Sequence, residues 1–354
     1  MFARARAVAH IAGRVSVAVG PRGFPSSSPA AAVAVGVKRH LSLTPRAYAA
    51  EAQSIGAESF AGSVAEHAKR EDLPCDTDVP VPAKHPGLAV QEKGSLHFLK
   101  NPVYSRADLD AVAITHRRPA SMRDSLALSS VGFMRSTFDR LTGYPHLTTA
   151  KSWLNRIVFL ETVAGVPGMV GGMLRHMKSL RGMRTDNQWI HTLLQEAENE
   201  RMHLLTFIKL RQPGIFFRLA VLVTQGIVFN AFLFFYLVNP RLCHSFVGYL
   251  EEEAVRTYTH CLDEIDQPGS AIHLWNKTPA PEIAIEYWKL ANTATMRDVI
   301  EVVRADEACH RHVNHTFSNM DEEDLNPFSP MGGKKELCIG KDEVKEEWKK
   351  RSHS

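Results

Sequence analysis

Two Glu-x-x-His segments decide the fold predicted for this chain: Glu200-Arg-Met-His203 and Glu307-Ala-Cys-His310. They are the only positions in the sequence at which a Glu precedes a His by three residues. Each segment lies in a stretch with helical periodicity, so its carboxylate and imidazole share one helix face, one turn apart. The sequence therefore places the same pair of polar groups on two different helices.

Pairs of this kind have a specific structural use. Two of them, joined by one Glu from each of two further helices, form a carboxylate-bridged di-iron site inside a four-helix bundle. Suitable residues are Glu161, in an apolar run, and the three consecutive Glu at 251–253. We therefore predict an all-α protein with a metal site in the bundle core.

Helix phase separates the three consecutive Glu residues. Glu251 shares a helix face with Val247, Ala254 and Tyr258. The next two Glu are rotated away from that face by steps of about 100°. The predicted metal ligands are Glu161, Glu200, His203, Glu251, Glu307 and His310.

Two plainer interpretations remain open at this point. The Glu–His pairs could lie on solvated surfaces, and Glu161 could be a core or rim carboxylate with an ordinary partner. If the six groups face inward together, however, a metal is needed, because unpaired charges in a core are very costly. Oxygen ligands completed by imidazole suit non-haem iron.

Composition is normal for a globular protein, with 44% hydrophobic and 23% charged residues among 354. The net charge of +4 is misleading, because residues 1–50 contain seven Arg and Lys and no Asp or Glu. The remainder of the chain is net acidic, so nucleic acid is not an expected partner. Five cysteines without Cys-x-x-Cys spacing argue against a disulfide framework or a zinc ribbon.

The basic N-terminus, rich in Arg, Ala and Ser, is typical of an organelle transit peptide. Arg39-His-Leu-Ser42 resembles a mitochondrial processing site, although a plastid destination or an untargeted basic tail remains an alternative. We expect a mitochondrial transit peptide over residues 1–50, an extended arm over 51–110, a di-iron helical domain over 111–320 and a charged tail over 321–354. The predicted helices are 120–140, 148–178, 185–211, 214–238, 240–264 and 283–318, with a kink near Pro167.

Four sequence boxes resemble those of the alternative oxidases, the cyanide-insensitive ubiquinol oxidases of the mitochondrial inner membrane. They are Leu160-Glu-Thr162, Asn199-Glu-Arg-Met-His-Leu204, Leu250-Glu-Glu-Glu-Ala254 and Arg304-Ala-Asp-Glu-x-x-His310. The resemblance covers roughly residues 100–320. It implies a ferritin-like di-iron bundle with two additional helices, usually dimeric and bound to one membrane leaflet on the matrix side.

The resemblance also implies roles for individual residues. It gives the same six iron ligands, and a redox-relevant tyrosine at Tyr258 that could otherwise be an ordinary core phenol. Asn199 and Asp306, beside the ligands, would orient them. The quinol pocket would involve Arg156, Leu160, Glu253, Ala254 and Thr257, of which the smaller residues could equally serve packing. Arg256 stands where many family members have His, and Cys75 does not match the regulatory cysteine region of plant members.

The apolar segment 215–238 is long enough to span a bilayer. His203 lies 12 residues before it and Glu251 lies 13 after it. A spanning segment would put these two ligands on opposite sides of a core about 30 Å thick, although they must meet at one metal site. We therefore expect this segment and the apolar part of 154–174 to lie along one membrane surface.

The predicted function is oxidation of two ubiquinols, through two iron ions, with reduction of O2 to water and without proton pumping. The alternatives are a plastid plastoquinol oxidase, a di-iron hydroxylase or desaturase, and an iron-storage bundle. An iron-storage bundle would not need the apolar surface of 215–238.

Overall fold

A computed structural model describes residues 73–74 and 103–328 of the chain, and all of its regular elements there are helical. The helices are α2 (Arg106–Asp110), α3 (Met122–Thr142), α4 (Ala150–Gly182), α5 (Trp189–Leu210), α6 (Ile215–Val238), α7 (Pro240–Asp266), η2 (His273–Asn276), α8 (Glu282–Trp288) and α9 (Met296–Asn319). The predicted all-α class is confirmed. The expected transit peptide, Cys75, most of the expected arm and residues 329–354 lie outside the described residues.

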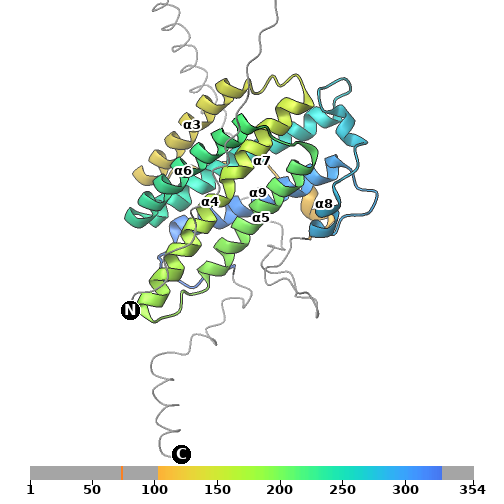
Figure 1. The fold of residues 1–354 in the computed structure, drawn as a ribbon. Coiled ribbons are helices and arrows are strands. Elements are labelled where there is room, and N and C mark those ends of the chain that lie inside the picture. The colour runs from red at the N-terminus through yellow and green to blue at the C-terminus, as the bar shows by residue number, and fades with distance from the viewer. Residues whose placement is uncertain (1–72, 75–102, 329–354) are drawn as a thin grey trace, which may run out of the picture. The chain divides into compact units, whose positions relative to one another are not determined.

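Four long helices form the bundle: α4 packs along α5, α7 packs along α9, and the two pairs face each other (Figure 1). Helix α3 covers α7 on the outside, and α6 lies across α4 and α7. The two additional helices are therefore α3 and α6. All of the predicted metal ligands are carried by the four bundle helices.

Helices α4 and α5 approach each other unusually closely near the site. A Cβ atom on Gly168 would lie 2.6 Å from the carbonyl oxygen of Leu193, so only glycine fits there. Helix α4 continues through Pro167 to Gly182 without ending. This contact sets Glu161, two turns earlier on α4, beside the ligands of α5.

The predicted single helix 283–318 is wrong, because the structure divides this stretch into α8 and α9. Lys289 ends α8 in the left-handed conformation, with φ of 55°, and no helix can propagate through that geometry. Thr295 then begins α9 with a capping box to Asp298. The break turns Trp288 into the bundle, where it becomes part of the site.

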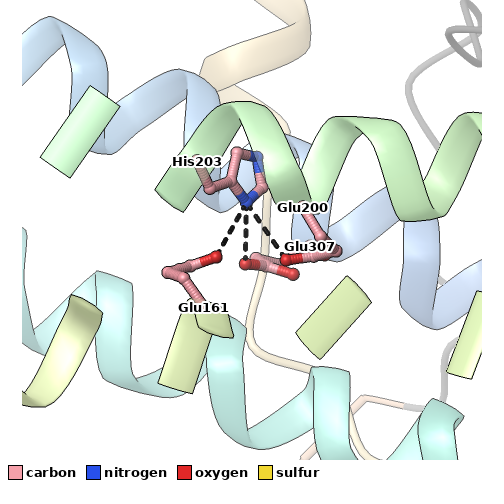
Figure 2. A group of neighbouring side chains, drawn as sticks. All are labelled: Glu161, Glu200, His203 and Glu307. Atoms are coloured by element: carbon pink, nitrogen blue, oxygen red, sulfur yellow. Dashed lines mark ion pairs between the residues drawn. The ribbon is translucent and has the colours of Figure 1, made fainter. Parts of the chain in front are cut away.

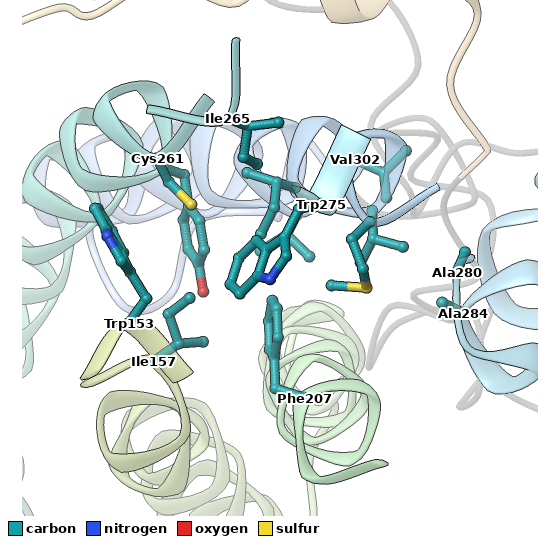
Figure 3. Close-up of a cluster of buried hydrophobic side chains, with 14 of the residues drawn as sticks. Trp153, Ile157, Phe207, Cys261, Ile265, Trp275, Ala280, Ala284 and Val302 are labelled. Carbon is teal, nitrogen blue, oxygen red and sulfur yellow. The ribbon is translucent and has the colours of Figure 1, made fainter. Parts of the chain in front are cut away.

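The core beside the site is rich in aromatic residues. Figure 3 shows Trp153 of α4, Phe207 of α5 and Trp275 of η2 gathered around Cys261 and Ile265 of α7. These side chains are almost completely buried. They join α4, α5 and α7 in one close-packed cluster, which also contains Tyr258.

Both ends of the described chain are held against the bundle. Near the N-terminus, Arg106 pairs with Glu301 at 2.8 Å, and Arg311 donates to the carbonyl of Ala113 at 3.1 Å. Near the C-terminus, the Trp189 indole donates to the carbonyl of Asp324 at 2.8 Å, and Asn326 is fully buried. Residues 321–328 are therefore anchored to α5 at Asp324 and Asn326, whereas loose packing was expected after about residue 319.

The surface of α6 is apolar and exposed. Ile215 is 74% exposed and Phe216 86% exposed, and more apolar side chains continue along the helix at Leu219, Leu222, Val223, Ile227, Phe234, Phe235, Leu237 and Val238. Helices α4 and α6 are both long and apolar enough to cross a membrane, but half of the most apolar stretch of α4 is buried against only 11% of that of α6. Helix α6 thus presents a large apolar face to its surroundings.

Candidate metal centre

Six buried side chains from the four bundle helices meet at one point in the core. They form two groups, each able to hold one cation: Glu161, Glu200, His203 and Glu307, and Glu200, Glu251, Glu307 and His310. Within each group the potential ligand atoms lie within 4.8 Å of one another. Glu200 and Glu307 belong to both groups, so each of these two carboxylates is within reach of either cation position.

Figure 2 shows the first group. The Nδ1 atom of His203 faces three carboxylates, at 3.4 Å from Glu161, 3.4 Å from Glu200 and 3.5 Å from Glu307. In the second group His310 Nδ1 lies 2.8 Å from Glu200 and 3.5 Å from Glu307. Of the three consecutive Glu residues, only Glu251 belongs to this group.

Many ligand atoms of this cluster are buried without a hydrogen bond. They are Glu161 Oε2, both oxygens of Glu200, His203 Nδ1, Glu307 Oε2 and His310 Nδ1. Orphaned polar atoms are rare in protein interiors, and here they all point to the same small volume. Carboxylate oxygens and imidazole nitrogens are ligands of divalent transition metals, so the residues fit a pair of such ions.

In the absence of a cation, burial and mutual repulsion shift the pKa values of the cluster residues. Burial raises the pKa of Glu161 to about 8, and burial with the nearby Glu307 and Glu200 carboxylates raises the pKa of Glu251 well above its usual range. Burial opposes a charge on His203, but the Glu200 carboxylate and the Asp306 hydrogen bond raise its pKa well above normal. The raised pKa values mean that these carboxylates are charged at neutral pH only beside a positive group, and that the imidazole is held positive by the carboxylates around it.

Asp306 holds one of the imidazoles in place. Its carboxylate accepts hydrogen bonds from His203 Nε2 at 3.0 Å, Asn199 Nδ2 at 2.9 Å and the Trp288 indole at 2.8 Å, and from the Tyr104 hydroxyl. A proton on Nε2 leaves Nδ1 as the metal-binding atom of His203. The structure thus sets the predicted Asn199 and Asp306 behind the ligand. Trp288 and Tyr104 were missed because nothing local in the sequence connects them to Asp306.

Tyr258 of α7 touches the metal cluster directly. Its buried hydroxyl donates a hydrogen bond to Glu161 Oε1. Burial and the Glu161 carboxylate raise the pKa of Tyr258 well above its usual range, so the phenol stays protonated. The predicted redox tyrosine is therefore one hydrogen bond from a metal ligand.

The polar residues of the predicted quinol pocket are linked by two arginines. Arg135 lies 2.9 Å from the Glu253 carboxylate and donates to Thr257 Oγ1 at 3.0 Å. Arg156 pairs with Asp139 and lies over the Tyr144 ring, 4.2 Å from its centroid. Leu160 and Ala254 are half-buried nearby on α4 and α7. Arg135, Asp139 and Tyr144, on α3 and the loop after it, were not identified from the sequence.

A cavity of about 460 Å³ reaches the metal centre from another side. It lies between α4, α5 and α6 and is lined by Glu161, Arg201, Gln225 and mainly apolar side chains. Among its lining residues, Gln225 of α6 donates a hydrogen bond to the carbonyl of Thr162 at 2.7 Å. None of the five predicted pocket residues lines this cavity.

Comparison with known proteins gives a consistent family match. Residues 104–319 match the protein family described as alternative oxidase. The "Alternative oxidase, mitochondrial" of Emericella nidulans is 53% identical over 242 residues, covering 65% of this chain and 68% of the relative. The proteins of the same name from Trypanosoma brucei brucei and Cryptococcus neoformans var. grubii are 52% identical over 232 residues and 48% identical over 253 residues. These matches cover 64% and 65% of this chain, and 70% and 63% of the relatives.

Proposed function

This chain belongs to the alternative oxidase family, and we propose that it oxidises two ubiquinols and reduces one O2 to two waters at a di-iron centre. The observation that carries the proposal is the pair of buried ligand groups that share Glu200 and Glu307. The curated relatives are named mitochondrial, which supports the mitochondrion as its location and disfavours the plastid alternative.

The chain's own residues prepare the site for two cations. Bound iron would supply the one-electron steps that connect quinol oxidation to oxygen reduction. Glu200 and Glu307 would bridge the ions, with Glu161 and His203 on one side and Glu251 and His310 on the other. Four carboxylates facing two divalent ions leave the buried cluster near neutrality, which removes the cost of burying the charges.

Tyr258 is suited to pass single electrons. It lies against Glu161 and is shielded from water, so its proton can move to the carboxylate when an electron leaves the phenol. Asp306 holds the second imidazole nitrogen of His203 and so preserves the ligand's orientation throughout the reaction.

The quinol would bind beside α3, α4 and α7. Arg156, Leu160, Glu253, Ala254 and Thr257 form the proposed pocket. Arg156 offers a guanidinium donor to a quinol oxygen, and its pairing with Asp139 and stacking on Tyr144 hold it ready. Quinol oxidation releases four protons per O2 and water formation uses four, so the reaction balances without proton pumping and its energy would appear as heat.

The exposed face of α6 supports binding to one leaflet of the inner membrane. Gln225, at the middle of α6, bonds to the residue after Glu161, so the middle of α6 lies at the level of the metal site. If α6 crossed the bilayer, the polar exterior of the bundle would enter lipid together with it. We therefore propose a monotopic protein with α6 toward the membrane, whereas α4, which was expected to join it there, has half of its most apolar stretch buried. The homodimer that the family resemblance implies is part of the proposal.

Three cations at the C-terminal end of α4 and just after it are paired with carboxylates of the protein. A lipid contact would therefore be made mainly by apolar residues. Arg175 is buried and pairs with Asp186 at 2.8 Å, and Lys178 pairs with Glu322 at 2.6 Å. Arg184 lies 3.1 Å from Glu323. These three cations are therefore engaged in ion pairs within the protein.

The test is cyanide-resistant oxidation of ubiquinol by the purified protein, measured with oxygen uptake and isotopically labelled O2. We expect all label in water and loss of activity in Glu200→Ala. Glu198→Ala, two residues away and partly exposed, is the matched control and should remain active. Label in an organic product would favour a hydroxylase, and activity in Glu200→Ala would contradict the metal assignment.

A further inference from the structure

Glu252 is a buried carboxylate on α7 that faces away from the metal ligands. Its Oε2 atom accepts a hydrogen bond from His116 Nδ1 at 2.7 Å. Its Oε1 atom accepts from His315 Nε2 at 2.8 Å and from the backbone N–H of Arg117 at 2.9 Å. We call this arrangement the Glu252 clamp: it joins α7, α9 and the segment before α3 through one side chain.

The clamp is one of three charge contacts made by consecutive residues of α7. Glu251 faces the metal cluster, Glu252 enters the clamp, and Glu253 meets Arg135 at 2.9 Å. Successive side chains on a helix point about 100° apart, so the three carboxylates face three different sides of α7. A rotation of α7 that moved Glu251 away from the metals would also break the clamp.

The surroundings of the clamp leave little room for His315 to move. A Cβ atom on Gly248 would lie 2.5 Å from His315 Nδ1, so the imidazole occupies the space of a missing side chain. The Tyr249 ring packs edge-on against it, with ring centroids 5.1 Å apart. Arg117 Nη1 donates to the carbonyl of His315 at 2.8 Å, which fixes the backbone as well.

We propose that Glu252 is a positioning residue for the metal centre: the clamp fixes the rotation of α7 and thereby the place of the Glu251 carboxylate. The segment around His116 and Arg117 would then help to position a metal ligand, although it lies on the far side of α7 from the cluster. The inference rests on the proposed di-iron function.

Glu301 provides a matched control. It is also a buried carboxylate, and it also ties the segment before α3 to α9, through Arg106 at 2.8 Å. Its other partner is Arg297 on its own helix, at 2.6 Å. Arg297 also pairs with Asp266 at the end of α7, at 2.8 Å, and this pair does not require Glu301, so loss of Glu301 should loosen the N-terminal segment without releasing α7.

The experiment compares Glu252→Ala, Glu252→Gln and Glu301→Ala for bound iron, the electron paramagnetic resonance spectrum of the half-reduced iron pair, and the kinetics of quinol oxidation. In Glu252→Ala we expect an altered spectrum and a fall in kcat of about tenfold or more, with KM for quinol within about twofold. Glu252→Gln should recover most of kcat, because an amide can still meet both imidazoles. Glu301→Ala should lower the melting temperature and leave the spectrum unchanged.

The outcomes separate this inference from the function on which it rests. A wild-type spectrum and kcat in Glu252→Ala would overturn the positioning role. If that variant does not fold, His116→Ala, which removes a single donor, decides by the same spectrum. Absence of an iron signal from the wild-type protein would instead overturn the proposed function.

Discussion

Two clusters of buried Glu and His residues lie on different sides of α7, and they differ in how their polar atoms are satisfied. In the metal centre, both Glu200 oxygens and His203 Nδ1 have no hydrogen bond, and His310 Nδ1 meets Glu200 only as an ion pair, at 2.8 Å. In the Glu252 clamp, both carboxylate oxygens accept hydrogen bonds, one of them twice. Residue types alone do not distinguish the two clusters. Convergent unsatisfied atoms indicate a cation site, and complete pairing indicates a structural contact.

The sharpest test of this contrast is the same Glu→Gln change in each cluster. Glu307→Gln removes a charged ligand from both metal groups, so we expect loss of iron and a fall in activity on the order of a thousandfold. Glu252→Gln leaves an amide that its neighbours can satisfy, so iron is retained. Iron analysis and oxygen uptake measure both effects, and equal iron loss in the two variants would remove the distinction.

Removing the metal should affect only one of the clusters. Chelation leaves four buried carboxylates facing one another, and we expect the melting temperature to fall by about 5–15 °C. Glu252→Gln should show the same difference between the metal-loaded and metal-free forms. Calorimetry checks this, and a metal-free protein as stable as the loaded one would contradict the cation interpretation.

A methyl group tests the packing of the clamp. Gly248→Ala would bring its Cβ within 2.5 Å of His315 Nδ1, and the forced shift should lower the free energy of unfolding by about 1–3 kcal/mol. Denaturant unfolding measures it. Gly226→Ala on α6, where an added Cβ meets no atom within 4 Å, is the control and should change stability far less.

The smallest change in the free energy of unfolding is expected for an exposed ion pair. Lys178 and Glu322 lie 2.6 Å apart, but their side chains are 43% and 34% exposed. Lys178→Ala should therefore change the free energy of unfolding by less than about 1 kcal/mol. A loss as large as that of Gly248→Ala would mean that solvent exposure does not separate these contacts.

The six side chains that meet in the core could be predicted because their signals are local. Glu200 and His203 are one turn apart, and the choice of Glu251 follows from the phase of its own helix. The helix boundaries of α6 and α7 were predicted nearly correctly for the same reason. The break between α8 and α9 was missed, because the residue that ends α8 in the left-handed conformation is Lys289, and no glycine or proline marks the position.

The Glu252 clamp could not be predicted from spacing. His116 and Glu252 are separated by 136 residues, and the segment that carries His116 has no regular structure of its own. A signal did exist: three consecutive Glu residues in a helix with a large apolar share leave at least one carboxylate to be paired elsewhere. Identifying its partners required the three-dimensional structure.

The clamp also has a consequence for the order in which the protein is completed. Its N-terminal partner, Arg117, contacts His315, which lies 198 residues later in the chain. A chain that crosses an organelle membrane N-terminus first delivers His116 and Arg117 long before α9 arrives. Contacts so distant in sequence close slowly, because the intervening chain must first be ordered. The contacts with His315 would thus be among the last to form, and until then the Glu252 carboxylate would have only its N-terminal partners, His116 and Arg117.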